Sequence, residues 1–281
     1  MTVVLAQVSD DELARYASLI YDRTGITVSP QKKTLLSNRV RRRLKATGIE
    51  DFETYYGHLR GLASDAPEWD AFLQEVTTHE TYLFRDETQW NWFSDEYLPQ
   101  LTAEANAGDR LKTLRIWSAA SSTGDEAHTI ATCIAAHLRQ CDDWNIEILG
   151  TDIGVGAIEL ARRGVFGERA MRLVPDNFRR RYFTALPDGK NWKAKESITR
   201  WISFRQHNLL DSLAERPFDL VFLKNVLIYF DIASKSKVIK NIDRVIKPGG
   251  LLLTAAAEGI SDLVGHMNKL KPWLHSKPAR K

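Results

Sequence analysis

Long apolar segments, cysteines and glycine-rich loops are all scarce in this 281-residue sequence. No stretch approaches the roughly 18 apolar residues of a membrane-spanning helix, so we predict no such helix. The two cysteines, Cys133 and Cys141, lack the spacing of a metal site, and we expect two reduced thiols. The first dozen residues show no basic segment and no signal-cleavage pattern, which favours a cytoplasmic protein.

The overall composition is that of an ordinary globular protein, with 43% hydrophobic and 27% charged residues. The length allows two modest domains or one large one. The net charge of +3 is weak evidence for any polyanionic partner.

The most informative stretch lies between residues 114 and 131. An apolar run over 114–117 is typical of a buried parallel strand, and a loop of small residues follows over 118–124. Asp125 and Glu126 then start a helical pattern, and acids suit the positive end of a helix dipole. This is the opening unit of a doubly wound α/β domain, which binds ligands at the carboxyl ends of its strands.

The same loop narrows the choice of ligand. It contains a single glycine, Gly124, whereas a dinucleotide fingerprint needs three spaced glycines and a P-loop needs Gly-Lys-Ser/Thr. A loop of Ala, Ser and Thr followed by acids suits a nucleoside that carries an amino group and no phosphate, such as S-adenosylmethionine (SAM). A plain α/β crossover turn that binds nothing is the alternative.

The N-terminal region reads as helices only, over about 9–25, 30–46, 51–62 and 67–76. Seven basic residues and no acid lie between Lys32 and Lys45. They predict either a solvated helix face or a docking surface for an acidic partner. The docking candidates are Arg39, Arg41, Arg42 and Arg43.

A polar and aromatic segment over 77–86 follows, and it is either a binding segment or a structural turn with a helix cap. His79-Glu80 lacks the second histidine of a zinc motif, so we expect no metal site. Aromatic-rich helices over 86–107 precede a turn, where we place the boundary between a helical domain, 1–107, and an α/β domain, 108–281.

The α/β domain continues with strands over 146–150, 201–205, 218–223 and 251–256. Asp152 follows the second strand, where nucleoside-binding domains hold ribose hydroxyls, although it could equally cap the next helix. Residues 165–200 break the α/β rhythm and predict a small inserted β-subdomain with a turn at 187–190.

Six motifs, in this order, carry a family resemblance: THETYLFRD, IWSAASSTGDEAHTIA, GTDI, QHNLLD, FLKNVLIYFD and KPGGLLL. Together they resemble the CheR family, SAM-dependent methyltransferases that esterify glutamate side chains on bacterial chemotaxis receptors. The resemblance implies a helical N-terminal domain, a doubly wound methyltransferase domain and an inserted β-subdomain. Its product would be S-adenosylhomocysteine, and its partner would be the cytoplasmic domain of a methyl-accepting receptor.

The resemblance also implies site residues. Arg85 and Tyr229 lie in motifs that line the methyl-transfer pocket and are the catalytic candidates. The implied cofactor contacts are His79, Thr81, Arg85, Ala119, Glu126, Asp152, Asn208, Leu209, Asn225 and Val226. This chain departs from the family pattern at His79, where Asn is more usual, at Lys224, where Arg is usual, and at Ala255–Ala257.

Two other functions stay open at this point. A SAM-binding regulatory or scaffold protein without turnover is compatible with the departures. A nucleic-acid methyltransferase is disfavoured, because neither a Pro-Pro-Tyr/Phe motif nor a Pro-Cys nucleophile follows the fourth strand. The glycine-poor loop disfavours a nicotinamide dehydrogenase.

Overall fold

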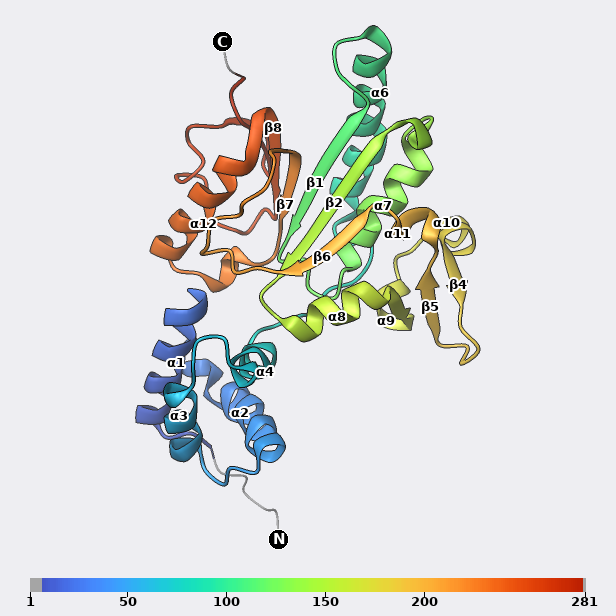
Figure 1. Ribbon diagram of the computed structural model, residues 1–281. Coiled ribbons are helices and arrows are strands. Elements are labelled where there is room, and N and C mark those ends of the chain that lie inside the picture. Colours follow the sequence, from blue (N-terminus) through green and yellow to red (C-terminus); the bar gives the residue numbers. More distant parts are fainter. Residues whose placement is uncertain (1–6, 280–281) are drawn as a thin grey trace.

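The computed structural model describes residues 7–279 and shows three parts (Figure 1). These are an N-terminal helical domain, a seven-stranded sheet covered by helices, and a small three-stranded sheet. The predicted fold class, a doubly wound α/β domain with a helical N-terminal domain and an inserted β-subdomain, is confirmed. Within residues 7–279, no helix is both long enough and apolar enough to cross a bilayer.

The N-terminal helices start and stop where capping chemistry predicts. Ser9 and Glu12 form a reciprocal capping box at the first helix, and Gly25 ends that helix with a left-handed φ of 73°. Asp51 caps the third helix by accepting the Thr54 N–H. The elements are α1 (Asp10–Thr24), η1 (Pro30–Lys32), α2 (Lys33–Thr47), α3 (Phe52–Gly61) and α4 (Pro67–Val76).

The central sheet has the strand order β6-β2-β1-β7-β8-β10-β9. The first five strands in this order are parallel, and β10 pairs antiparallel with both β8 and β9. All five predicted strands are present, and β9 and β10 were not predicted. The strands are β1 (Thr113–Ala119), β2 (Asn145–Asp152), β6 (Ile202–Gln206), β7 (Phe218–Leu223), β8 (Ile246–Thr254), β9 (Asn268–Lys271) and β10 (Leu274–Ser276).

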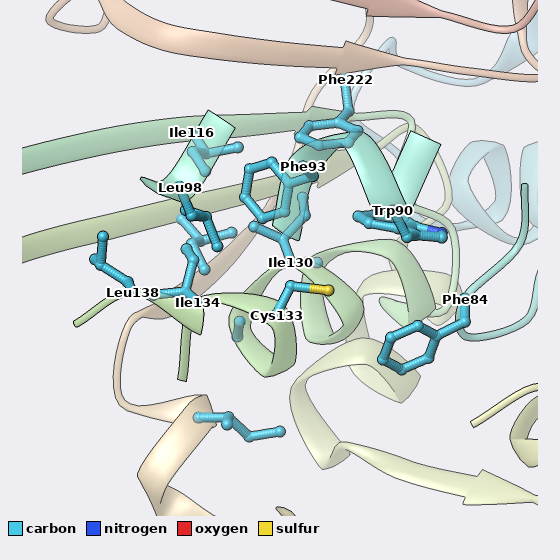
Figure 2. Close-up of a cluster of buried hydrophobic side chains, with 14 of the residues drawn as sticks. Phe84, Trp90, Phe93, Leu98, Ile116, Ile130, Cys133, Ile134, Leu138 and Phe222 are labelled. Carbon is cyan, nitrogen blue, oxygen red and sulfur yellow. The ribbon is translucent and has the colours of Figure 1, made fainter. Parts of the chain in front are cut away.

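Helices cover both faces of this sheet and form two apolar clusters. One cluster contains α12 and the other contains α7 with the aromatic helices over 87–107. Figure 2 shows Trp90 and Phe93 from these aromatic helices beside Phe222 of β7, and the Trp90 and Phe222 rings stack at 5.4 Å. The helices are α5 (Glu87–Trp92), the π-helix η2 (Phe93–Tyr97), α6 (Leu98–Ala107), α7 (Asp125–His137), η3 (Cys141–Asp143), α8 (Val155–Arg163), η4 (Leu227–Tyr229) and α12 (Ile232–Val245).

This packing bears on the domain boundary. Helices α5 to α6 share their core with the sheet, whereas residues up to Val76 form a separate cluster. On these contacts we propose that the two domains meet near residue 78 rather than at 107.

The inserted subdomain runs from β3 to α11. Its strands form an antiparallel sheet in the order β3-β5-β4, and Gly189 adopts a left-handed φ of 68° in the predicted turn. Its elements are β3 (Val165–Gly167), α9 (Glu168–Met171), α10 (Asp176–Tyr182), β4 (Phe183–Ala185), β5 (Asn191–Ala194) and α11 (Glu196–Thr199).

The N-terminal domain packs against the carboxyl ends of the central strands (Figure 1). The Tyr21 hydroxyl donates to Asp231 at 2.8 Å, and the Gln74 side-chain oxygen accepts the Ala157 N–H at 3.0 Å, at the start of α8. The edge where an α/β sheet binds its ligands is therefore roofed by the helical domain.

Candidate functional site

A cleft of about 1330 Å³, open to solvent, lies between the two domains. Its floor comes from the loops after β1, β2, β6 and β7, and its roof from residues 24–28, η1, α2 and the linker over 76–85. It therefore coincides with the carboxyl edge of the sheet. All but one of the expected cofactor and catalytic residues line it, namely His79, Thr81, Arg85, Glu126, Asp152, Asn208, Leu209, Asn225, Val226 and Tyr229.

Asp152 lies at the tip of β2 with a carboxylate that is held from two sides. One oxygen accepts the Ser122 N–H and the other accepts the Gly154 N–H, both at 2.9 Å. Each oxygen retains a further lone pair, and the side chain lines the cleft. A fixed carboxylate of this kind can accept hydrogen bonds from a pair of ligand hydroxyls.

His79 reaches Asp152 from the linker. Its Nε2 lies 2.7 Å from the Thr77 hydroxyl, and that hydroxyl donates its own hydrogen to the Leu73 carbonyl. Nε2 is therefore the protonated nitrogen, which leaves Nδ1 facing Asp152 Oδ1 at 3.6 Å. Burial lowers the pKa of His79 and outweighs the opposing effect of Asp152, so the ring is neutral at pH 7.

The loop after β1 lines the cleft with residues 120–122. Ala120 and Ser122 both have positive φ, at 62° and 50°, which is a strained backbone for residues with a side chain. The expected contact Ala119 is still part of β1 and its side chain lies in the core, so Ala120 takes its place at the cleft. The Ser121 hydroxyl lines the cleft and has no hydrogen-bond partner among the described residues.

Glu126 and Lys224 form a charged pair inside the cleft. Lys224, whose side chain is 3% exposed, lies 3.7 Å from Glu126 and 3.1 Å from Asp86. Glu126 also accepts the Ser118 hydroxyl at 2.8 Å. Burial raises the pKa of Glu126, and the nearby Lys224 opposes part of that rise.

Arg85 and Thr81 come from the linker. Arg85 is flanked by Phe84 and Asp86, whose φ values of 58° and 68° are both left-handed. Its backbone carbonyl accepts the Trp90 indole N–H, and its guanidinium contacts the Glu80 carbonyl only at 3.4 Å. The backbone of Arg85 is thus anchored, while its guanidinium finds no stronger acceptor than the Glu80 carbonyl within residues 7–279.

The loop after β6 carries Asn208 and Leu209. The Asn208 amide donates to the Arg23 carbonyl of α1 at 2.8 Å and accepts the Leu210 N–H at 3.1 Å. This residue thereby ties the cleft floor to the N-terminal domain. Its neighbour His207 lines the cleft with a buried Nε2 for which the described residues supply no partner.

The loop after β7 carries Asn225, Val226 and Tyr229. Asn225 has a φ of 58°, and the Tyr229 carbonyl accepts the Thr27 N–H at 2.8 Å. Lys32 from η1 lies 5.3 Å from the centre of the Tyr229 ring. The two domains therefore meet at this loop.

Two family models match this chain almost end to end. The one described as "CheR methyltransferase, all-alpha domain" matches residues 11–77, and "CheR methyltransferase, SAM binding domain" matches residues 79–273. The chain belongs to the CheR methyltransferase family.

Curated relatives agree with this family assignment. The chemotaxis protein methyltransferase of Salmonella typhimurium is 32% identical over 94% of this chain and 88% of its own length. That of Escherichia coli is 31% identical over 94% of this chain and 89% of its own length. Chemotaxis protein methyltransferase 1 of Pseudomonas aeruginosa is 34% identical over 86% of this chain and 88% of its own length. This CheR chain is thus a SAM-dependent methyltransferase of the chemotaxis type.

The residues in the cleft fit SAM. Two buried polar atoms, Ser121 Oγ and His207 Nε2, face it without partners in residues 7–279, and Asp152 offers a fixed acceptor pair. Glu126 supplies a carboxylate for an amino group. Across the described part of this CheR chain, no group of three or more His, Cys, Asp or Glu side chains could hold a metal ion.

The basic helix α2 divides into distinct groups. Arg43 makes a forked pair with Glu68 and its side chain is 17% exposed, so we leave Arg43 out of any docking surface. Arg39 donates to the Val76 carbonyl and lines the cleft. Arg41 is half-buried and Arg42 is exposed, although Arg42 also contacts Glu75.

Some lining residues of this CheR cleft were not predicted. They include Lys32, Ser121, His207 and the strap over 24–28. The orphaned polar atoms of Ser121 and His207 arise only from burial, which the sequence does not show. Contacts from residues 24–28 to residues 229–230 span about two hundred positions, and no local pattern signals them.

Proposed function

We propose that this chain transfers the methyl group of SAM to glutamate side chains on the cytoplasmic domain of methyl-accepting chemotaxis receptors, forming methyl esters. The observation that carries the proposal is the set of cations at the cleft. Lys32, Arg39 and Arg85 line it together with Tyr229. A cleft lined by these cations favours an anionic methyl acceptor such as a carboxylate.

Bound SAM supplies an electrophilic methyl group on a sulfonium. A glutamate side chain has a pKa of about 4.3 and is already ionised at neutral pH, so its attack requires no general base. The task left to the chain is alignment and charge stabilisation, which are large terms in catalysis.

Each cleft residue then has a defined task. Asp152 holds the ribose hydroxyls, and Glu126, which lies beside Lys224, holds the methionine amino group. Arg85 orients a carboxylate with its spare donors, and Tyr229 shapes the line of approach. His79, Thr81, Ala120, Asn208, Leu209, Asn225 and Val226 complete the cofactor contacts.

The acceptor would be presented along α2. Arg41 and Arg42 remain the docking candidates, since an acidic receptor helix would meet them on the way to the cleft. Long-range attraction of this kind mainly raises the association rate and weakens with added salt.

The test is methyl transfer from labelled SAM to a purified cytoplasmic receptor fragment. We expect label that alkali releases as volatile methanol, because esters hydrolyse in base and N-methyl groups do not. A fragment with its acceptor glutamates changed to alanine should take up none. Alkali-stable label, or no transfer by a chain that binds the cofactor, would contradict the proposal.

A further inference from the structure

We propose that Glu258 is a positioning residue for the cleft, acting through the loop over 225–229. Its buried carboxylate grips the backbone of that loop, which carries Asn225, Val226 and Tyr229 to the cleft wall. The inference rests on the proposed placement of SAM beside this loop, and it is independent of the methyl acceptor.

The first observation is the place of Glu258. It follows β8, and β8 pairs with β7 up to Leu223 and Thr254, so the two strand tips are neighbours. The side chain is 0% exposed and does not line the cleft. It therefore lies behind the loop, where it cannot touch a ligand but can hold the loop in place.

The second observation is the direction of the loop's N–H groups. Glu258 Oε1 accepts the Val226 N–H at 3.3 Å, and Oε2 has no partner in residues 7–279. Burial raises the pKa of Glu258, and the N–H groups of Asn225, Val226 and Ile228 oppose that rise. The Val226 N–H is thus hydrogen-bonded to the carboxyl group, and the N–H groups of Asn225 and Ile228 act on the same group from the same loop.

The loop conformation explains this arrangement. Asn225 has a left-handed φ of 58°, and Val226 follows with φ −121° and ψ −41°. A left-handed residue next to a right-handed one turns successive N–H groups toward the same side, which makes a concave anion site. Glu258 fills that site, and this offsets the strain that a non-glycine residue has at such a φ.

Other contacts hold the remaining parts of the same unit. The Tyr229 carbonyl is held by Thr27 of the strap, and the Glu258 carbonyl accepts Lys235 Nζ at 2.7 Å. The alanines over 255–257 lie outside the cleft lining, so the departure from the family there leaves the wall intact. Glu258, which follows these alanines, is the residue that supports the cleft wall.

The experiment is calorimetric titration of S-adenosylhomocysteine into the full chain carrying Glu258→Gln. The amide keeps the shape and one acceptor oxygen, but it removes the carboxylate charge and replaces the second oxygen with a donor. We expect a folded protein whose affinity falls by about tenfold or more, the equivalent of one lost charge-assisted hydrogen bond.

The matched control is Asp219→Asn, at the opposite end of β7. Asp219 is also a buried acid that accepts a backbone N–H, that of Arg115 at 2.7 Å. The Asp219→Asn substitution should lower the melting temperature and leave the affinity for S-adenosylhomocysteine unchanged. This comparison separates a positioning role from general destabilisation.

Unchanged affinity in a folded Glu258→Gln protein would overturn the inference, and so would an equal loss in Asp219→Asn. Should Glu258→Gln fail to fold, Glu258→Asp takes its place, since it keeps the charge and withdraws it by one methylene. A loss of about threefold is then expected, and wild-type affinity would overturn the inference. If the unmodified chain does not bind, the placement of SAM itself fails, a result distinct from failure of the Glu258 role alone.

Discussion

Strained backbone positions are concentrated around the cleft. Five of the six non-glycine residues with positive φ in the described chain lie beside Arg85 or in loops that line the cleft. Such conformations cost about 1–3 kcal/mol each and persist where the surroundings fix them. At this scale, the site is a set of fixed backbone positions with a few unsatisfied polar atoms facing inward.

Arg85 provides a direct test of alignment. We expect Arg85→Ala to lower turnover on a receptor fragment by roughly 100-fold, the effect of removing one fixed donor from a charged transition state. The turnover of Arg85→Lys should lie between those of the wild type and Arg85→Ala, because lysine keeps the positive charge but lacks the planar, two-pronged donor geometry of arginine. Wild-type turnover together with wild-type cofactor affinity in Arg85→Ala would refute the assignment.

His79 predicts a pH dependence. Burial lowers the pKa of His79, so the ring gains a proton only at a more acidic pH than an exposed histidine would. The new N–H then faces Asp152. A charged His79 would compete with the ribose hydroxyls for that carboxylate. We expect the affinity for S-adenosylhomocysteine to drop between pH 7.5 and 5.5 by about threefold more in the wild type than in His79→Asn. Parallel pH profiles for the two proteins would contradict this.

The residues that line the cleft could be expected from the sequence because the six motifs occur in order and most of them span or follow the end of a predicted strand. Ala119 shows the limit of such reasoning. Adjacent residues at a strand end face different ways, so a shift of one position moved the expected contact into the core. The positioning role of Glu258 was also not predicted, since only the folded loop shows where the N–H groups point.

Elements with a strong apolar pattern were predicted well. Strand β7 is buried throughout, and all of its residues except Asp219 are apolar. By contrast, β9 is mostly exposed, and its sequence Asn268–Lys271 is polar, so no pattern marked it as a strand. The aromatic helices over 87–107 were predicted, but their association with the sheet depends on tertiary contacts such as Trp90 with Phe222.

Helix α2 carries the prediction for docking. Reversing charge with Arg41→Glu and Arg42→Glu should raise the apparent KM for a receptor fragment by about tenfold at low salt. The difference should shrink as the salt concentration rises, and cofactor affinity should stay unchanged.

The matched control for that experiment reverses two exposed lysines of α12, with Lys237→Glu and Lys240→Glu. An equal rise in KM in this control would show that net charge, rather than α2, sets the effect. Loss of cofactor binding in the α2 variant would point to misfolding.

At the scale of the molecule, the cleft belongs to both domains. The strap over 24–28 pairs with residues 229–230, and Asn208 is tied to the backbone of α1. Ligand binding should therefore stabilise the N-terminal domain as well as the sheet domain.

We expect S-adenosylhomocysteine at about 100 times its Kd to raise the free energy of unfolding by about 2.7 kcal/mol. Amide hydrogen exchange should slow in the strap as well as in the loops of the sheet domain. Protection confined to the sheet domain would show that the roof takes no part in binding.

The central claim is that the strand tips hold SAM through Asp152, and calorimetric titration with S-adenosylhomocysteine tests it most directly. The account predicts binding by the unmodified chain and an affinity lower by roughly 10- to 100-fold in Asp152→Asn, since a charged acceptor is lost. Equal affinity in the two folded proteins would contradict the account and place the cofactor elsewhere.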